Sequence, residues 1–167
     1  MADEVPQTDD RDPAEVVSAM VEGVLALART WPAWDGRPRP RKDGAAVYTP
    51  HKAIRRVTDH LVDHLAEVEA RLAGVATLPD HWHASVVTTA ADMAAFTGDD
   101  LDEGRSRLTR LAQVWALRLG ALDAERLDRQ EGGAWTLRQV AFHVAESIVY
   151  AESVGDLAAE AHDRACA

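Results

Sequence analysis

Residues 50–72 read PHKAIRRVTDHLVDHLAEVEARL, and this stretch decides the fold. Thr49 and Pro50 are typical of a helix start, because a threonine oxygen can cap free backbone N–H groups and proline suits the first turn. Apolar residues then recur at helical spacing until the chain reaches Gly74, a residue type common just after helix ends. These apolar residues are Ile54, Val57, Leu61, Leu65, Val68 and Leu72. The pattern predicts one long amphipathic helix with a single buried face.

Three further helices are predicted on the same grounds. The first runs from a cap at Asp12 to about residue 30, the third begins at about Asp99, and the fourth begins at Thr136. Glu15 and Gln139 stand three residues after the caps of the first and fourth helices, as in a capping box. The apolar stripes of the three helices are Val16, Met20, Val24 and Leu27; Leu101, Leu108, Leu111, Trp115, Leu119 and Leu122; and Leu137, Val140, Val144, Ile148 and Ala151.

Two long connections separate the predicted helices. Residues 31–48 contain three prolines and two glycines, which break both helix and strand. Residues 75–98 form the second connection, with one short helix expected at about 89–95. No alternating apolar and polar run of strand length occurs, so the four helices can bury their stripes only against one another. We therefore predict an all-α protein, a four-helix bundle with two long connecting loops.

The length of 167 residues suits one domain, because a compact chain of this size buries enough surface to fold without disulfides. With 47% hydrophobic and 28% charged residues, the chain has the composition of a globular protein. Residues 1–11 are acidic and lack an apolar period, so we assign them to a disordered tail and residues 12–160 to the domain. A single cysteine, Cys166, can form no internal disulfide, which agrees with a reducing compartment.

The formal net charge of −10 argues against nucleic acid as a partner, since such binding depends on Lys and Arg neutralising phosphates. Arg105, Arg107, Arg110 and Arg118 are interpreted as the solvated face of the third helix. The longest apolar stretch, residues 16–28, is interrupted by Glu22 and is too short to cross a bilayer. The acidic start lacks the basic segment of a secretory signal. We expect a cytoplasmic protein whose partners are a small-molecule substrate and, at most, a second copy in a homodimer.

Three histidines form the candidate site. His60 and His64 are four residues apart, so they project from the same face of one helix, a spacing from which two imidazoles can bind one ion. Stepping along the stripe from Val57 reaches both, and His143 follows Val140 by three residues in the fourth helix. Three inward histidines suffice for a divalent metal with a remaining position for water or substrate. The alternative is that they are core histidines satisfied by neighbouring polar groups.

Carboxylates follow each of these histidines by three residues: Asp63, Glu67 and Glu146. They are candidates for orienting an imidazole ring or for acting as general base, and the alternative is ordinary surface charge. His81, Trp82 and His83 form a His-Trp-His element in the second long connection. We expect this element to contact substrate over the open side of the site, against surface packing as the alternative.

Two segments resemble a known family. Residues 133–147, GAWTLRQVAFHVAES, resemble the Trp-[Thr/Ser]-x-x-x-[Val/Leu]-x-x-His helix start of the DinB-like, or YfiT-like, metalloenzyme superfamily. Residues 54–64, IRRVTDHLVDH, are similar to its His-x-x-x-His element. The resemblance implies a four-helix bundle in which His143 is the ligand from one helix and His60 with His64 are the paired ligands.

The order of the two elements is reversed here, because in typical members the helix that begins with Trp comes second and the His-x-x-x-His helix fourth. This reversal suggests a circular permutation, which a bundle tolerates when its termini lie close together. The resemblance implies a divalent metal ion, which we expect to be zinc, with nickel or iron as alternatives. It also implies thiol-dependent S-transferase, isomerase or hydrolase chemistry, with a low-molecular-weight thiol such as mycothiol. A metal- or ligand-binding bundle of a stress response, without turnover, is the alternative function.

Overall fold

The computed structural model describes residues 5–42, 44–79 and 86–159, and most of these residues are helical. The all-α class predicted from the sequence is therefore confirmed. In chain order the elements are α1 (Pro13–Ala28), η1 (Trp31–Ala33), β1 (Arg39–Pro40), β2 (Val47–Tyr48), α2 (Pro50–Leu72), η3 (Ala91–Met93), α3 (Gly98–Gly120), α4 (Ala124–Leu127), α5 (Leu137–Ala145) and α6 (Ile148–Val154).

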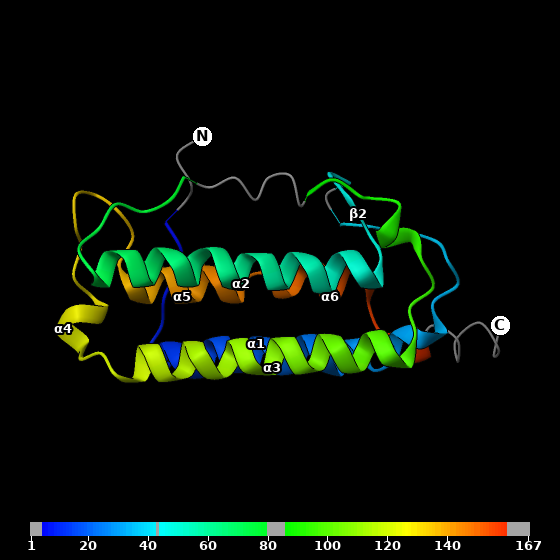
Figure 1. Cartoon of the computed structure of the whole chain (residues 1–167), viewed down its shortest axis with the longest axis horizontal. Helices are drawn as coiled ribbons and strands as arrows, with labels where there is room; N and C mark the ends of the chain where they lie inside the picture. The colour runs from blue at the N-terminus through cyan, green and yellow to red at the C-terminus, as the bar shows by residue number, and fades with distance from the viewer. Residues whose placement is uncertain (1–4, 43, 80–85, 160–167) are drawn as a thin grey trace.

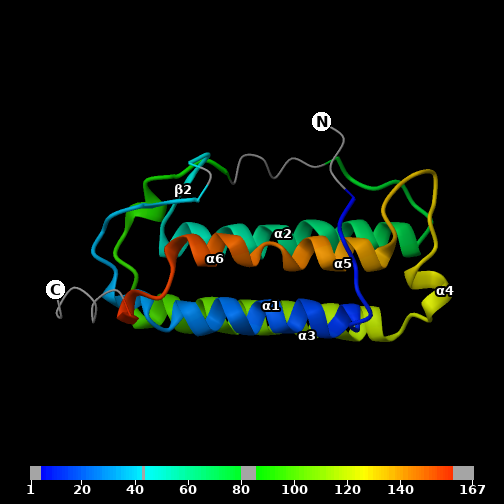
Figure 2. The ribbon, with the colours of Figure 1, turned by 180° about the vertical axis from the view of Figure 1, so that it is seen from behind.

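The long helices pack in two layers (Figure 1). One layer holds α2 side by side with α5 and α6, which follow each other along one line, and the other layer holds α1 beside α3. The view from behind shows the same arrangement, with α1 in front of α3 (Figure 2). α2 ends at the end of the molecule where α4 lies, and α3 begins at the opposite end.

The helix starts follow from capping side chains. Asp12 accepts a hydrogen bond from the backbone N–H of Ala14, and Thr49 accepts one from Lys52. Thr136 begins α5 with a reciprocal capping box to Gln139. These three caps were predicted. α3 begins at Gly98, within one residue of the expected start, and its cap is Thr97, which forms a capping box with Asp100.

The fourth predicted helix is interrupted, which corrects the continuous helix expected from the sequence: α5 ends at Ala145 and α6 begins at Ile148. At the break, the N–H of Glu146 is shared between the carbonyls of Phe142 and His143, and the N–H of Ser147 bonds to Val144. Hydrogen bonds to the third preceding residue thus replace the helical pattern for about one turn. The apolar positions stay on the same face, so hydrophobic spacing cannot detect this break.

The two-residue strands β1 and β2 form an antiparallel pair in which Arg39 faces Tyr48 and Pro40 faces Val47. No strand was expected, since two residues are too few to show an alternating pattern. The short helix expected at 89–95 is the single 3-10 turn η3.

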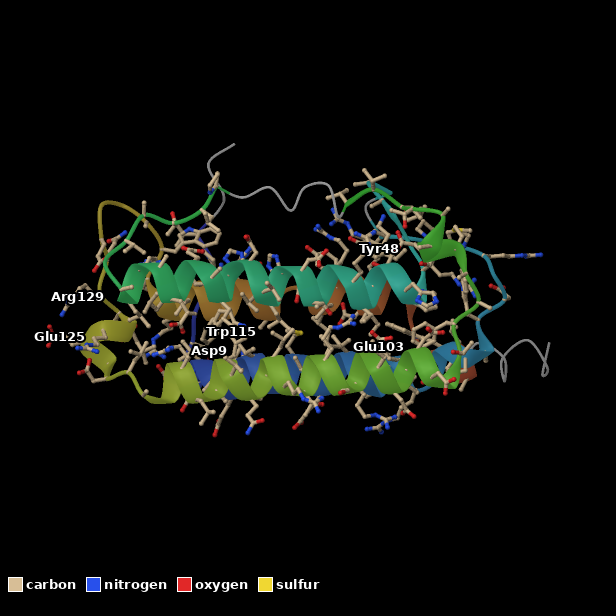
Figure 3. The ribbon with its side chains drawn as sticks, viewed as in Figure 1. Asp9, Tyr48, Glu103, Trp115, Glu125 and Arg129 are labelled. Atoms are coloured by element: carbon tan, nitrogen blue, oxygen red, sulfur yellow. The ribbon has the colours of Figure 1, made fainter. Side chains whose placement is uncertain are left out.

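The core lies between the two layers, as the side chains in Figure 3 show. Trp115 is fully buried, and its Nε1–H donates to the carbonyl of Leu61 at 3.1 Å, which joins α3 to α2. Trp31 donates in the same way to the carbonyl of Gly155 at 2.9 Å. α1 approaches α6 closely at Gly23, where a Cβ atom would lie 2.6 Å from Cδ1 of Ile148.

The charged surface agrees in part with the sequence. Arg105, Arg107 and Arg110 are exposed on α3, as expected, whereas Arg118 is half-buried and pairs with Glu69 of α2. Residues 5–12 precede α1 without regular structure and pass over α5, where the guanidinium of Arg11 lies over the Phe142 ring. Within the described residues, no helix is both long enough and apolar enough to cross a membrane.

Candidate metal centre

Three imidazoles meet between α2 and α5. The ring centroids of His60 and His64 lie 4.7 Å apart, those of His60 and His143 lie 4.9 Å apart, and those of His64 and His143 lie 5.1 Å apart. The planes of the three ring pairs are inclined by 63° to 87°, so the rings do not stack face to face. The convergence predicted from the spacing of these residues is therefore present in the structure.

The donor atoms suit a transition metal ion. One nitrogen atom from each ring lies within 4.8 Å of the others. Ligand nitrogens on one tetrahedral zinc ion lie about 3.4 Å apart, given Zn–N bonds of about 2.0–2.1 Å. Small rotations of the side chains would close this difference. Within the described residues, the histidine, cysteine and carboxylate groups that lie close enough together to hold an ion are these three histidines.

The pKa of His60 is strongly perturbed. Burial, followed by the neighbouring His64 and His143, lowers the pKa of His60 from 6.5 to about 3. The imidazole is therefore neutral near pH 7, which is the form that binds metal. The side chains of His64 and His143 are 15% and 28% exposed, so the site is partly open to solvent at these two rings.

Two carboxylates hold the outer nitrogens of the other two rings. Nδ1 of His64 lies 2.8 Å from Oε2 of Glu67, and Nδ1 of His143 lies 3.3 Å from Oε2 of Glu146. A proton on Nδ1 would be donated to the carboxylate, which leaves the lone pair of Nε2 for an ion. The hydrogen bond with His64 is the main reason why the pKa of Glu67 is lowered.

Aromatic rings flank the histidines on both sides. The ring of Trp135, which precedes the cap of α5, lies 4.8 Å from that of His143. The ring of Tyr150 in α6 lies 6.3 Å from that of His60, and its hydroxyl accepts a hydrogen bond from Arg56 at 2.9 Å.

Sequence reasoning did not place Tyr150 or Arg56 at the site. Helical spacing carried a signal for both, since Arg56 precedes His60 by four residues and Tyr150 follows His143 by seven. This spacing predicts a position near the site only when the three histidines are already assumed to form its centre.

A cavity of about 370 Å³ adjoins the histidines. Its walls come from α2, from the connection that follows α2, and from the segment before α5: Asp63, His64, Ala66, Glu67, Thr77, Leu78, Gly133, Ala134 and Trp135. Asp63 and Glu67 both lie on the cavity wall beside His64, and Glu67 also contacts the His64 ring. The cavity offers a small molecule direct access to a ligand of the candidate centre.

The predicted substrate contacts His81, Trp82 and His83 lie outside the described residues. No family model matches the chain, and no curated protein or solved structure matches it significantly. The candidate centre therefore depends on its own geometry.

Proposed function

We propose that this chain binds one divalent metal ion through His60, His64 and His143, with zinc as the preferred candidate. We also propose that it is a DinB-like four-helix bundle whose helices follow in permuted order. The observation that carries the proposal is the mutual approach of three imidazole nitrogens to within 4.8 Å from two different helices. Satisfied core histidines would instead each have a separate polar partner and no reason to converge. The carboxylates on Nδ1 of two rings add support, since such partners accompany metal-binding histidines.

We further propose that the site is catalytic and acts on a small molecule. Three protein ligands leave a position for water or substrate, and the 370 Å³ cavity beside His64 supports access to it. A metal ion bound there would lower the pKa of a coordinated water or thiol, as S-transfer, isomerisation or hydrolysis requires. The family resemblance favours a low-molecular-weight thiol such as mycothiol as co-substrate.

The three carboxylates take different parts in this proposal. Glu67 and Glu146 orient the rings of His64 and His143 through Nδ1. Asp63 is the candidate general base, because it lines the cavity that a substrate would enter.

The experiment measures metal by elemental analysis of purified protein, for the parent chain and for His64→Ala. We expect about one transition ion per chain in the parent and loss of most of it in the variant, because two ligands make an inadequate site. His51→Ala is the matched control, since His51 lies on the same helix but packs against Phe96. Equal metal content in the parent and in His64→Ala would exclude the ligand assignment.

Catalysis is then tested by screening the metal-loaded protein with thiols and electrophiles. Turnover that disappears in His64→Ala supports an enzyme. Stoichiometric metal without turnover of any thiol and electrophile pair favours the binding bundle.

A further inference from the structure

A second cavity, of about 180 Å³, lies where α2 ends and α5 begins. Three arginines line it together with one carboxylate and two leucines: Arg71, Leu72, Arg126, Arg129, Glu131 and Leu137. The lining carries a surplus of two positive charges in a chain whose net charge is −10. By volume the cavity has room for about six water molecules, enough for a carboxylate or phosphate group.

The arginines are not needed to complete the end of α2. Positive side chains often bond to the last carbonyls of a helix. Here backbone groups occupy those carbonyls: Ala73 donates to Glu69, Val75 to Ala70, and Gly74 to Arg71. Bonds to these carbonyls therefore do not account for the position of the arginines.

The three guanidinium groups are held to different degrees. The side chain of Arg71 is only 10% exposed and lies 3.4 Å from Oε1 of Glu67. Arg129 is 52% exposed and pairs with Glu125 at 2.7 Å. Arg126 is exposed, and its guanidinium forms no hydrogen bond or ion pair with the part of the chain that the structure describes. One largely shielded arginine, Arg71, and one arginine whose guanidinium has no partner in the described part of the chain, Arg126, thus line the same cavity.

This cavity adjoins the one beside the histidines. α2 and the segment between α4 and α5 wall both cavities, and Glu67 connects them, with Oε2 on His64 and Oε1 on Arg71. His64 and Arg71 are seven residues apart on one helix face, about 10 Å along the axis. A small molecule of ordinary size can reach from one to the other.

We propose that this arginine pocket binds the oxyanion group, a carboxylate or a phosphate, of the small molecule on which the histidine site acts. The identification of that molecule as the substrate depends on the proposed function; the anion site itself does not. Arginine is suited to the task because its planar guanidinium can donate two parallel hydrogen bonds to an oxyanion. Glu131 at the rim opposes binding and sets its strength.

The test is titration calorimetry of EDTA-treated protein with sodium phosphate and, separately, sodium acetate, at constant ionic strength. Removal of metal ensures that neither anion is bound as a metal ligand. We expect saturable binding of at least one of the two anions. Arg126→Gln and Arg129→Gln should each weaken it at least threefold, and the double variant about tenfold, because each removes a charged donor.

Two variants sharpen the test. Arg107→Gln is the matched control for Arg129→Gln. Arg107 is 50% exposed and, like Arg129, pairs with the glutamate four residues before it. It should leave anion binding unchanged. Glu131→Gln should strengthen binding about twofold, because it removes a repelling charge from the wall. Arg71→Gln is less informative, since it would also disturb Glu67.

Three outcomes would overturn the proposal: no saturation with either anion, equal weakening by Arg107→Gln and Arg129→Gln, or weaker binding in Glu131→Gln. Failure of the anion site is separable from failure of the metal site. Metal content in His64→Ala reports on the histidines alone, whereas phosphate and acetate binding without metal reports on the arginines alone.

Discussion

Nδ1 of His64 lies 2.8 Å from Oε2 of Glu67, one helical turn further along α2. In the equivalent pair at the end of α5, His143 and Glu146, the distance is longer at 3.3 Å and the carboxylate is more exposed, 62% against 29%. The two carboxylates thus have the same chemical part at the proposed metal site but unequal strength. A hydrogen bond that is shorter and more shielded from water contributes more.

This asymmetry predicts unequal effects of removing the two charges. Glu67→Gln should lower zinc affinity about tenfold or more, the range found when carboxylate partners of metal-binding histidines are replaced. Glu146→Gln should have a smaller effect. Competition with a chromophoric chelator measures both affinities. Glu69→Gln serves as control and should match the parent. Glu69 lies on α2, like Glu67, but its charge pairs with Arg118 of α3. A larger loss in Glu146→Gln than in Glu67→Gln would contradict the assignment.

The stability of the metal-free protein should depend on pH through His60. Its pKa is about 3 in the folded protein, chiefly because of burial, and about 6.5 when unfolded, so the unfolded chain binds more protons between these values. The contribution of His60 to the free energy of unfolding should therefore be fully retained above about pH 7. It should decrease as the pH falls below 6.5, by about 2 kcal/mol between pH 7 and pH 5. Urea unfolding in EDTA measures it. His60→Gln should flatten this slope, and a parent protein equally stable at pH 5 and pH 7 would rule the effect out.

Trp115 should contribute strongly to stability. Trp115→Phe removes the hydrogen bond to the carbonyl of Leu61 and leaves a small cavity between α3 and α2, at a cost of about 1–3 kcal/mol. Trp34→Phe is the control, because Trp34 is only half-buried and bonds locally to the carbonyl of Arg37. Its cost should be below about 1 kcal/mol. Denaturation followed by circular dichroism gives both values, and equal costs would show that Trp115 has no special part in the packing.

The His-Trp-His element gives a prediction that stands on the sequence. Replacing His81 and His83 together by Ala should leave metal content unchanged and weaken the binding of any ligand found by screening. The expected reason is that the connection after α2 reaches the cavity beside His64, where Thr77 and Leu78 already form part of the wall. Elemental analysis and calorimetry make the two measurements. Loss of metal in the double variant would instead point to a direct ligand among these residues.

Local signals in the sequence determined the helices and their starts. The caps at Asp12, Thr49 and Thr136 were predictable because each acts on N–H groups two or three residues away. The pairing of His60 with His64 on one face was predictable for the same reason, since helix geometry fixes neighbours four residues apart. The break at Glu146 was not, because it preserves the apolar spacing on which the prediction depends.

Packing between distant segments decided the site. The resemblance implied that His143 joins the pair, but only the placement of α5 against α2 brings its ring within 4.9 Å of His60. The same placement sets Trp135 against His143. The position of α4 and of the segment after it beside the end of α2 brings Arg71, Arg126 and Arg129 into one cavity. Periodicity in a sequence reports which face of a helix is apolar, whereas the register and contact partners of two helices are set by how their side chains interlock across the core. The sequence alone therefore determined which side chains were candidates, and the tertiary structure decided which of them meet.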